Sequence, residues 1–377
     1  MRIGSHELRL EKRFSVTGWQ AATISILAIF TALVLFSIIF ILDGINPITA
    51  YQEIFKYAFA SPFGLPLTMS RFIFLLLCTY AFIIPYRAGL WNIGVTGQLY
   101  AGALCVFAVV TAFGGKKADS NLIPGLVIPL MLIASTLGGA LLGAIAGFLK
   151  GRYNINEIVV TMMLNFMMFW VVSFMIKEGG VFMKSGGEGE GFKLPTTLFA
   201  PKIIGIPFTI LIALGLAVLL YYMFAKTRIG YQIKAYGQKP AAARYAGISA
   251  VRIPLLVFLM GGALGGLAGY HYFAAVPGLY NIPVNYGEFG DIAFYGIICG
   301  LISLGNPLAA IPVSLLFAGL SVGGRSVQGK LHMSFGVDYA LLGVLMITLV
   351  AFQFFYRYKI VWVKTAKKES LDVGIPG

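Results

Sequence analysis

Charged side chains are scarce in this chain of 377 residues. Only 11% of its residues are Asp, Glu, Lys or Arg, whereas 59% are hydrophobic. A water-soluble domain carries about 25% charged residues. The composition therefore excludes an ordinary soluble fold and indicates a membrane protein. Acidic residues are the rarer sign, since 14 Asp and Glu oppose 28 Lys and Arg and leave a formal net charge of +14.

Side chains that catalyse reactions or bind metals are also few. The three cysteines lie in apolar stretches without a C-x-x-C pair, and the three histidines stand far apart, so no metal-binding spacing exists. The chain has no G-x-x-x-x-G-K-[ST] motif, which predicts that it has no ATPase site of its own. A G-x-S-x-G match at 319–323 falls in an apolar helix rather than a strand-to-helix turn, and we interpret it as accidental.

Long apolar runs are abundant. A helix needs about 20 apolar residues to cross a bilayer. Ten runs of about this length predict an all-α, polytopic membrane protein of about ten transmembrane helices. They lie at 20–42, 66–85, 89–113, 123–149, 157–176, 202–224, 253–275, 288–303, 305–323 and 337–356. Gly305-Asn306-Pro307 fits either a tight turn between two helices or a break in a re-entrant one, so nine and eleven spans are alternatives.

The first apolar run resembles a signal peptide because basic residues precede it. Its length exceeds a normal signal core, and no small-x-small cleavage pattern follows it, so we predict a retained helix. The basic residues concentrate in alternate loops, which places both termini in the cytoplasm. We divide the chain into a cytoplasmic N-terminal segment (1–18), a transmembrane domain (19–356) with a cytoplasmic loop at 225–252, and a cytoplasmic tail (357–377).

Glycines recur at every fourth residue in two of the predicted helices. One ladder is Gly139, Gly143 and Gly147, and the other is Gly261, Gly265 and Gly269. Small residues at this spacing let helix backbones approach closely in lipid, so we predict helix-packing seams. One ladder lies in each half of the chain, which suggests an internal two-fold repeat of the kind found in transporters.

Ionisable residues inside the predicted spans are rare. Arg71 and Asp291 are the clearest, and both lie near span ends, where snorkelling to the interface explains them. Ion-coupled carriers usually need carboxylates or histidines at membrane depth. This scarcity favours an external energy source over proton coupling.

Two polar segments interrupt the apolar pattern. In Gly89-Leu90-Trp91-Asn92-Ile93-Gly94-Val95-Thr96-Gly97-Gln98, three glycines and three polar side chains loosen a helix, which membrane proteins tolerate only inside protein or beside a watery cavity. In the segment 154–165, Thr161 and Asn165 share one helix face. A solute path accounts for both segments, and interhelical hydrogen bonding explains the second equally well.

The loop at 225–252 contains six basic residues and no acidic residue. An alanine-rich stretch between Pro240 and Gly247 predicts a short helix, with Pro at its start and Gly at its end. A compact element of this kind is typical of a docking site, whereas a merely basic, lipid-facing loop is the alternative. The charge pattern follows topology, so we do not expect nucleic-acid binding.

These three segments together resemble the permease subunits of ATP-binding cassette (ABC) importers in the branched-chain amino-acid, ribose and simple-sugar superfamily, and most closely the bacterial nucleoside and simple-sugar branch. The resemblance covers about residues 60–356. It rests on Asn92-Ile93-Gly94-x-x-Gly97-Gln98, on 156–165, and on the loop from Arg228-Ile229-Gly230 to Gly247. The family often has Glu where this chain has Thr96.

The resemblance implies a machine in the bacterial cytoplasmic membrane that transports a solute without chemistry on it. Its partners are an ATP-binding cassette subunit, which holds the ATP and Mg, a second permease subunit, identical or not, and an extracytoplasmic solute-binding lipoprotein. This chain needs no cofactor. The family's coupling helix corresponds to the loop at 227–248, so the resemblance predicts an ATPase contact at Gly237, Lys239, Ala243, Arg244 and Gly247. We hypothesise that a solute path is bordered by Asn92, Thr96, Gln98, Thr161 and Asn165.

Nucleosides are the preferred solute, followed by simple sugars such as ribose or galactose and then by riboflavin. An ion-coupled secondary carrier is the alternative from another class. A membrane enzyme or a structural subunit is a third possibility, and the lack of clustered His, Asp, Glu or Ser residues speaks against it.

Overall fold

The computed structural model describes residues 2–3, 6–12, 18–116, 122–177, 179–186, 189–283, 290–331, 333 and 336–364. Residues 288–289 of the eighth predicted span and 365–377 of the predicted tail lie outside these ranges. The chain divides into two compact units. One comprises Met1–Gly44 and Gly343–Gly377, and the other comprises Ile45–Leu342.

The smaller unit pairs the two ends of the chain. It contains β1 (Arg2–Ile3), β2 (His6–Lys12), α1 (Gly18–Leu42), most of α13 (Val337–Arg357) and β5 (Tyr358–Lys364). The strands form an antiparallel sheet in the order β1-β2-β5, in which His6 pairs with Lys364 and Lys12 with Tyr358. Lys359 and Glu11 form an ion pair of 2.8 Å across these strands. The sequence analysis did not predict this sheet. Apolar and charged residues alternate in β2, the two-residue period of a strand, but the run is short.

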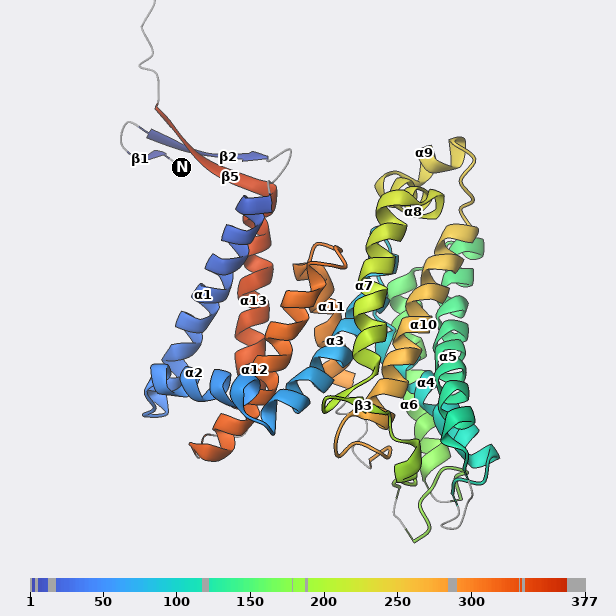
Figure 1. The fold of residues 1–377 in the computed structure, drawn as a ribbon. Coiled ribbons are helices and arrows are strands. Elements are labelled where there is room, and N and C mark those ends of the chain that lie inside the picture. Colours follow the sequence, from blue (N-terminus) through green and yellow to red (C-terminus); the bar gives the residue numbers. More distant parts are fainter. Residues whose placement is uncertain are drawn as a thin grey trace, which may run out of the picture. The chain divides into compact units, whose positions relative to one another are not determined.

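The larger unit is almost entirely helical (Figure 1). Its helices are α2 (Pro47–Phe55), the π-helix η1 (Lys56–Ala60), α3 (Gly64–Arg87), α4 (Val95–Ala112), α5 (Pro124–Tyr153), α6 (Glu157–Ile176), α7 (Thr209–Lys226), α8 (Arg228–Gln238), α9 (Pro240–Tyr245), α10 (Arg252–Ala275), α11 (Gly290–Ile302) and α12 (Ala310–Lys330), with the start of α13. Between α6 and α7 lie the short 3-10 helix η2 (Thr196–Leu198) and the hairpin of β3 (Lys202–Ile203) and β4 (Ile206–Pro207).

Each of the ten predicted spans coincides with a helix, and the all-α membrane class is confirmed. Within the described residues, eight helices are long and apolar enough to cross a membrane, and α1 followed by α2 brings the number to as many as nine. The predicted span that does not qualify is α11, which has 13 residues. A helix of that length extends roughly 20 Å, less than the hydrocarbon thickness of about 30 Å.

Three helix boundaries differ from the prediction. The third span begins at Val95 rather than 89, because residues 88–94 form a non-helical connection. The sixth begins at Thr209 rather than 202, because the β3–β4 hairpin occupies the start of the run and turns at Ile204 and Gly205, both at positive φ. The ninth is α12, which extends to Lys330 instead of ending at 323.

The Gly305-Asn306-Pro307 segment is a turn between two helices, not a break within one. Leu304 and Gly305 have φ angles of 52° and 68°, in the left-handed region. The Asn306 backbone N–H donates to Ser303 O at 2.9 Å, and the Leu308 N–H donates to Asn306 Oδ1 at 3.1 Å. The turn therefore ends α11 and precedes the start of α12 at Ala310.

The two glycine ladders pack on two different sides of α10. The ladder of α5 faces Gly262 and Gly266 of α10, so a Cβ added at Gly266 would come within 3.0 Å of the Gly139 Cα. The other ladder faces α3 and α4, since a Cβ at Gly261 would lie 2.6 Å from Ala81 O. Backbone contact at this spacing supplies van der Waals packing that apolar lipid cannot replace. The prediction of helix packing is confirmed, whereas the internal repeat stays a prediction.

We expect Gly266→Ala to lower the thermal unfolding temperature of the purified protein. The added methyl group meets backbone atoms of α5, which cannot move aside, so a loss of about 1–3 kcal/mol is expected. Gly215→Ala in α7 is the matched control, because no atom lies within 4 Å of the added Cβ. Equal melting temperatures for the two variants would contradict the seam.

Candidate functional site

The break between α3 and α4 is held by a pair of buried amides. Asn92 is 0% exposed and Gln98 is 2% exposed. Asn92 Nδ2 donates to Gln98 Oε1 at 3.0 Å, and Gln98 Nε2 donates back to Asn92 Oδ1 at 3.1 Å. Asn92 Nδ2 also donates to Ala81 O at 3.1 Å, and its Oδ1 accepts the Gly94 N–H at 3.2 Å. The two amides therefore satisfy each other and the broken backbone.

A third amide joins α6 to the same break. Asn165 Oδ1 accepts the backbone N–H of Gly97 at 2.8 Å, and its Nδ2 donates to Ile93 O at 2.9 Å. Thr161, one turn earlier and fully buried, donates to Glu157 O at 2.8 Å. A Cβ added at Gly94 would lie 3.0 Å from the Thr161 Cβ, so α6 packs closely on this segment.

The structure thus brings the predicted path residues together at the junction of α4 and α6. Thr96 is half-buried in the first turn of α4, between Asn92 and Gln98 in sequence. Hydrogen bonding explains the positions of Asn92, Gln98 and Asn165. A role of the five residues in bordering a solute path stays a prediction.

The predicted coupling loop folds as two helices. In α8, the Thr227 side chain accepts the Gly230 N–H at 3.1 Å and caps the helix start. The short α9 begins at Pro240 as expected. It ends where the Ile248 N–H bonds Ala243 O at 2.9 Å and Gly247 adopts φ +79°. The predicted alanine-rich helix is therefore confirmed, whereas α8 was not predicted from the sequence.

The coupling segment, residues 227–248, is attached to the ends of the spanning helices. A Cβ on Gly237 would lie 2.5 Å from Arg87 O, so the backbones of α8 and of the α3 end are in contact. The Arg87 side chain extends this junction, because its Nε donates to Gly305 O at 2.7 Å and its guanidinium lies over the Phe224 ring. One arginine at the end of α3 therefore joins α7 and the α11–α12 turn.

An ion pair holds the corner between α5 and α6, whose charges act on the coupling segment. Lys150 and Glu157 form an ion pair of 2.9 Å with little exposure. Burial raises the pKa of the neighbouring Tyr236 hydroxyl, although the Lys150 and Arg244 charges act in the opposite direction. Tyr236 and Ile233 are the buried residues by which α8 packs against the helices.

The predicted ATPase-contact residues separate into two groups. Lys239, Arg244 and Gly247 are exposed. Gly237 contacts Gly89, and Ala243 is only 3% exposed, so the positions of these two residues are explained by packing within the chain. Tyr245 was not among the predicted residues, yet it is 95% exposed on α9. The sequence offered one indication of this residue, an aromatic side chain directly after the predicted contact residue Arg244.

This arrangement, apolar helices with a basic helical segment fixed to their ends, is that of a membrane transport component. The chain belongs to the family described as "Branched-chain amino acid transport system / permease component", which it matches over residues 66–350. It is therefore a multi-pass membrane protein and a permease component.

Three relatives indicate the branch. A glucose ABC transporter permease protein of Haloferax volcanii is 30% identical over 375 residues, which cover 94% of this chain and 93% of the relative. A nucleoside ABC transporter permease protein of Lactococcus lactis is 30% identical and covers 80% and 83%. A guanosine ABC transporter permease protein of Bacillus subtilis is 26% identical and covers 87% and 92%. The predicted resemblance to the nucleoside and simple-sugar branch is confirmed.

We expect Asn92→Ala to lower thermal stability and solute uptake together. The substitution leaves the buried amide of Gln98 and the Ala81 carbonyl without their partner, which costs about 1–3 kcal/mol. Melting temperature and uptake are measured on the same preparation, with exposed Gln52→Ala as the control. Reduced uptake at an unchanged melting temperature would instead assign Asn92 to the solute path.

Proposed function

We propose that this chain is the transmembrane permease subunit of an ATP-driven importer that moves nucleosides across the cytoplasmic membrane by alternating access. The observation that carries the proposal is the coupling segment, a folded element that contacts α3, α7 and α10. A rigid attachment of this kind transfers a push on α9 to several spanning helices at once. This geometry suits an energy source outside the chain.

The ATP-binding subunit is proposed to contact the exposed face of α9, at Lys239, Arg244, Tyr245 and Gly247. The surrounding loop carries six basic residues and no acidic one, which supports a cytoplasmic location for this end of the helices. Figure 1 shows α8 and α9 together at the end of the larger unit where α10 begins. ATP and Mg belong to that partner, and the complex is completed by a second permease subunit and an extracytoplasmic solute-binding lipoprotein.

Nucleosides are the proposed solute because two of the three relatives above bear nucleoside or guanosine in their names. Simple sugars are the second candidate, favoured by the glucose permease relative that matches 94% of this chain.

Uptake by the reconstituted complex tests the proposal. We expect labelled guanosine to accumulate in proteoliposomes that contain ATP, and accumulation to persist with an uncoupler because no ion gradient drives it. Labelled glucose is the parallel substrate. Uptake that needs no ATP and collapses with the uncoupler would identify an ion-coupled carrier instead.

The coupling surface has its own test. We expect Arg244→Glu and Tyr245→Ala to lower ATP-driven uptake about tenfold or more, corresponding to roughly 1.4 kcal/mol of lost contact energy. We also expect less of the ATP-binding subunit to co-purify with each variant. Lys202→Glu in β3 is the matched control, since this residue is exposed but far along the chain from α9. Normal uptake and co-purification in both variants would rule out this surface as the contact.

A further inference from the structure

A cavity lies at the opposite end of the larger unit from the coupling segment. Its volume is about 430 Å³, within the range of small-molecule sites. It is bounded by the first turns of α3, the last turn of α10 with the connection at 276–279, and the last third of α12. Because α3 ends and α10 begins beside α8 and α9, these bounding segments belong to the far side of the membrane from the proposed ATPase contact.

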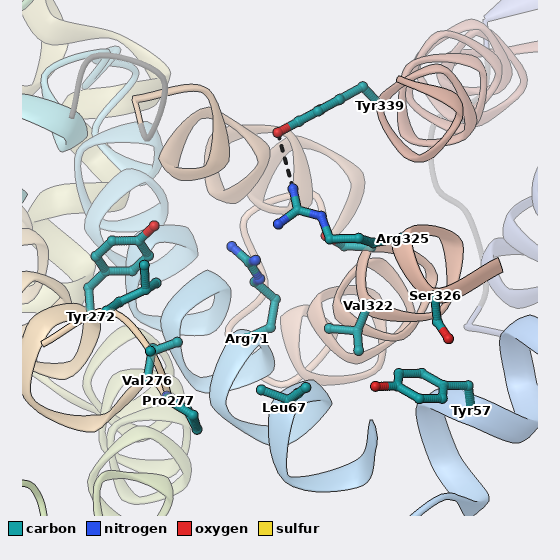
Figure 2. Close-up of a pocket in the computed structure, with 13 residues that line it drawn as sticks. Tyr57, Leu67, Arg71, Tyr272, Val276, Pro277, Val322, Arg325, Ser326 and Tyr339 are labelled. Carbon is teal, nitrogen blue, oxygen red and sulfur yellow. Dashed lines mark hydrogen bonds between the residues drawn. The ribbon is translucent and has the colours of Figure 1, made fainter. Parts of the chain in front are cut away.

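Two arginines and three tyrosines make the lining of this cavity cationic and aromatic. Figure 2 shows the Arg71 and Arg325 side chains extending from facing helices, with the Arg325 guanidinium turned toward the Tyr339 hydroxyl and the Tyr57 hydroxyl directed toward Leu67. Tyr339 and Tyr272 complete the aromatic lining. Arg325 Nη2 donates to the Tyr339 hydroxyl at 3.2 Å, which orients the guanidinium plane.

A buried histidine fixes the wall that Arg71 and Tyr272 share. His271 Nε2 donates to Ser70 O at 2.9 Å, so its Nδ1 accepts the Thr209 hydroxyl at 2.7 Å. Ser70 precedes Arg71, and His271 precedes Tyr272, so this bond sets the register of the two lining residues. The Tyr272 ring also packs on Phe74 with ring centres 4.8 Å apart.

The opposite wall is built from a distorted helix. Tyr57 lies in the π-helix η1, a conformation that is rare and frequent at functional sites. Lys330 lies 6.0 Å from the Tyr57 ring centre and forms a 2.8 Å ion pair with Glu53, which ties the end of α12 to α2. The lining side chains are thus placed by contacts outside the cavity.

The hydrogen-bonding capacity of the lining selects the class of ligand. Arginine only donates, and the side-chain acceptors of the described lining are tyrosine and serine hydroxyls, without the carboxylate or amide of an Asp, Glu, Asn or Gln side chain. A hexose presents many hydroxyl donors that need such acceptors. A purine nucleoside presents ring acceptors that suit a guanidinium fork, with O6 and N7 of guanine as the usual bidentate pair, and an aromatic base that stacks on phenol or guanidinium planes.

We propose that this cavity is a solute site within the permease, where Arg71 and Arg325 donate to the base of a purine nucleoside and the tyrosines pack against its rings. The inference rests on the proposed importer function and names the solute class and the residues that select it. The site is separate from the residues at the α4–α6 junction.

Photolabelling of the assembled transporter tests the inference. The complex with its partner subunits is irradiated with an azido-purine nucleoside, and labelled peptides are mapped by mass spectrometry. We expect labelling at 276–279 and 321–326 that excess guanosine abolishes and excess glucose does not. Arg325→Gln and the cavity-filling Ser321→Trp are expected to reduce labelling about tenfold or more, and Arg325→Lys less, because lysine keeps a donor but not the fork.

Co-purification of the ATP-binding subunit and basal ATP hydrolysis show that each variant is assembled, and Lys202→Gln is the exposed control. Three results would overturn the site. The first is unchanged labelling in both Arg325→Gln and Ser321→Trp, and the second is labelling at 92–98 alone. The third is stronger competition by inosine monophosphate or glucose than by guanosine. If labelling is unchanged and guanosine uptake is also normal in Arg325→Gln and Ser321→Trp, the cavity is not the solute site, and the proposed importer function is unaffected. Wild-type complex that takes up neither guanosine nor glucose with ATP overturns both.

Discussion

The direct contact of three helix backbones, α4, α5 and α10, is the constraint on which the larger unit depends. Lipid is as apolar as a leucine side chain, so burying hydrophobic surface gives helices in a bilayer little reason to associate. Glycines at Gly102, Gly139, Gly262 and Gly266 remove the side chains between these helices and let the backbones touch. Because its backbone is packed against α4 and α5, α10 is a rigid helix that extends from the coupling segment to the cavity. Polar bonds hold the two more exposed helices: Asn165 joins α6 to the start of α4, and the Thr209–His271 bond joins α7 to α10.

The buried amide and imidazole side chains reflect a second constraint, because a polar group at membrane depth needs a hydrogen-bond partner. Asn92 and Gln98 pair with each other, Asn165 pairs with the backbone of the α4 start, and His271 pairs with α3 and α7. The Asn165 and His271 bonds cross between helices and fix their relative positions, whereas the Asn92–Gln98 pair ties the connection after α3 to the first turn of α4. The three amides therefore close the break between α3 and α4, and His271 aligns the cavity wall that carries Arg71 and Tyr272.

The sequence alone predicted the spanning helices, the glycine seams and the Pro240–Gly247 helix, because each depends on a local period or a local turn signal. It did not predict α2 and η1, whose nine and five residues are too short for a membrane-spanning run, or the pairing of β2 with β5, which are separated by more than 340 residues. The partners of Asn92 and Asn165 are long-range or geometric, so interhelical bonding and a solute path remained equal interpretations. Arg71 was explained by snorkelling, and Arg325 lay beyond the predicted end of its span. Their common cavity appears only when α3 and α12 pack.

The pairing of β2 with β5 constrains the whole topology. Two strands that share a seven-residue ladder must lie on one side of the membrane, and a chain whose two ends meet there crosses an even number of times. Eight helices in the described residues qualify by length, and α1 with α2 would make nine. Parity removes nine and eleven, so a crossing by α1 requires a crossing by the short α11 as well. A helix of roughly 20 Å crosses only where protein or a thinned bilayer shortens the distance, so a ten-helix topology implies a locally thin hydrocarbon layer around α11.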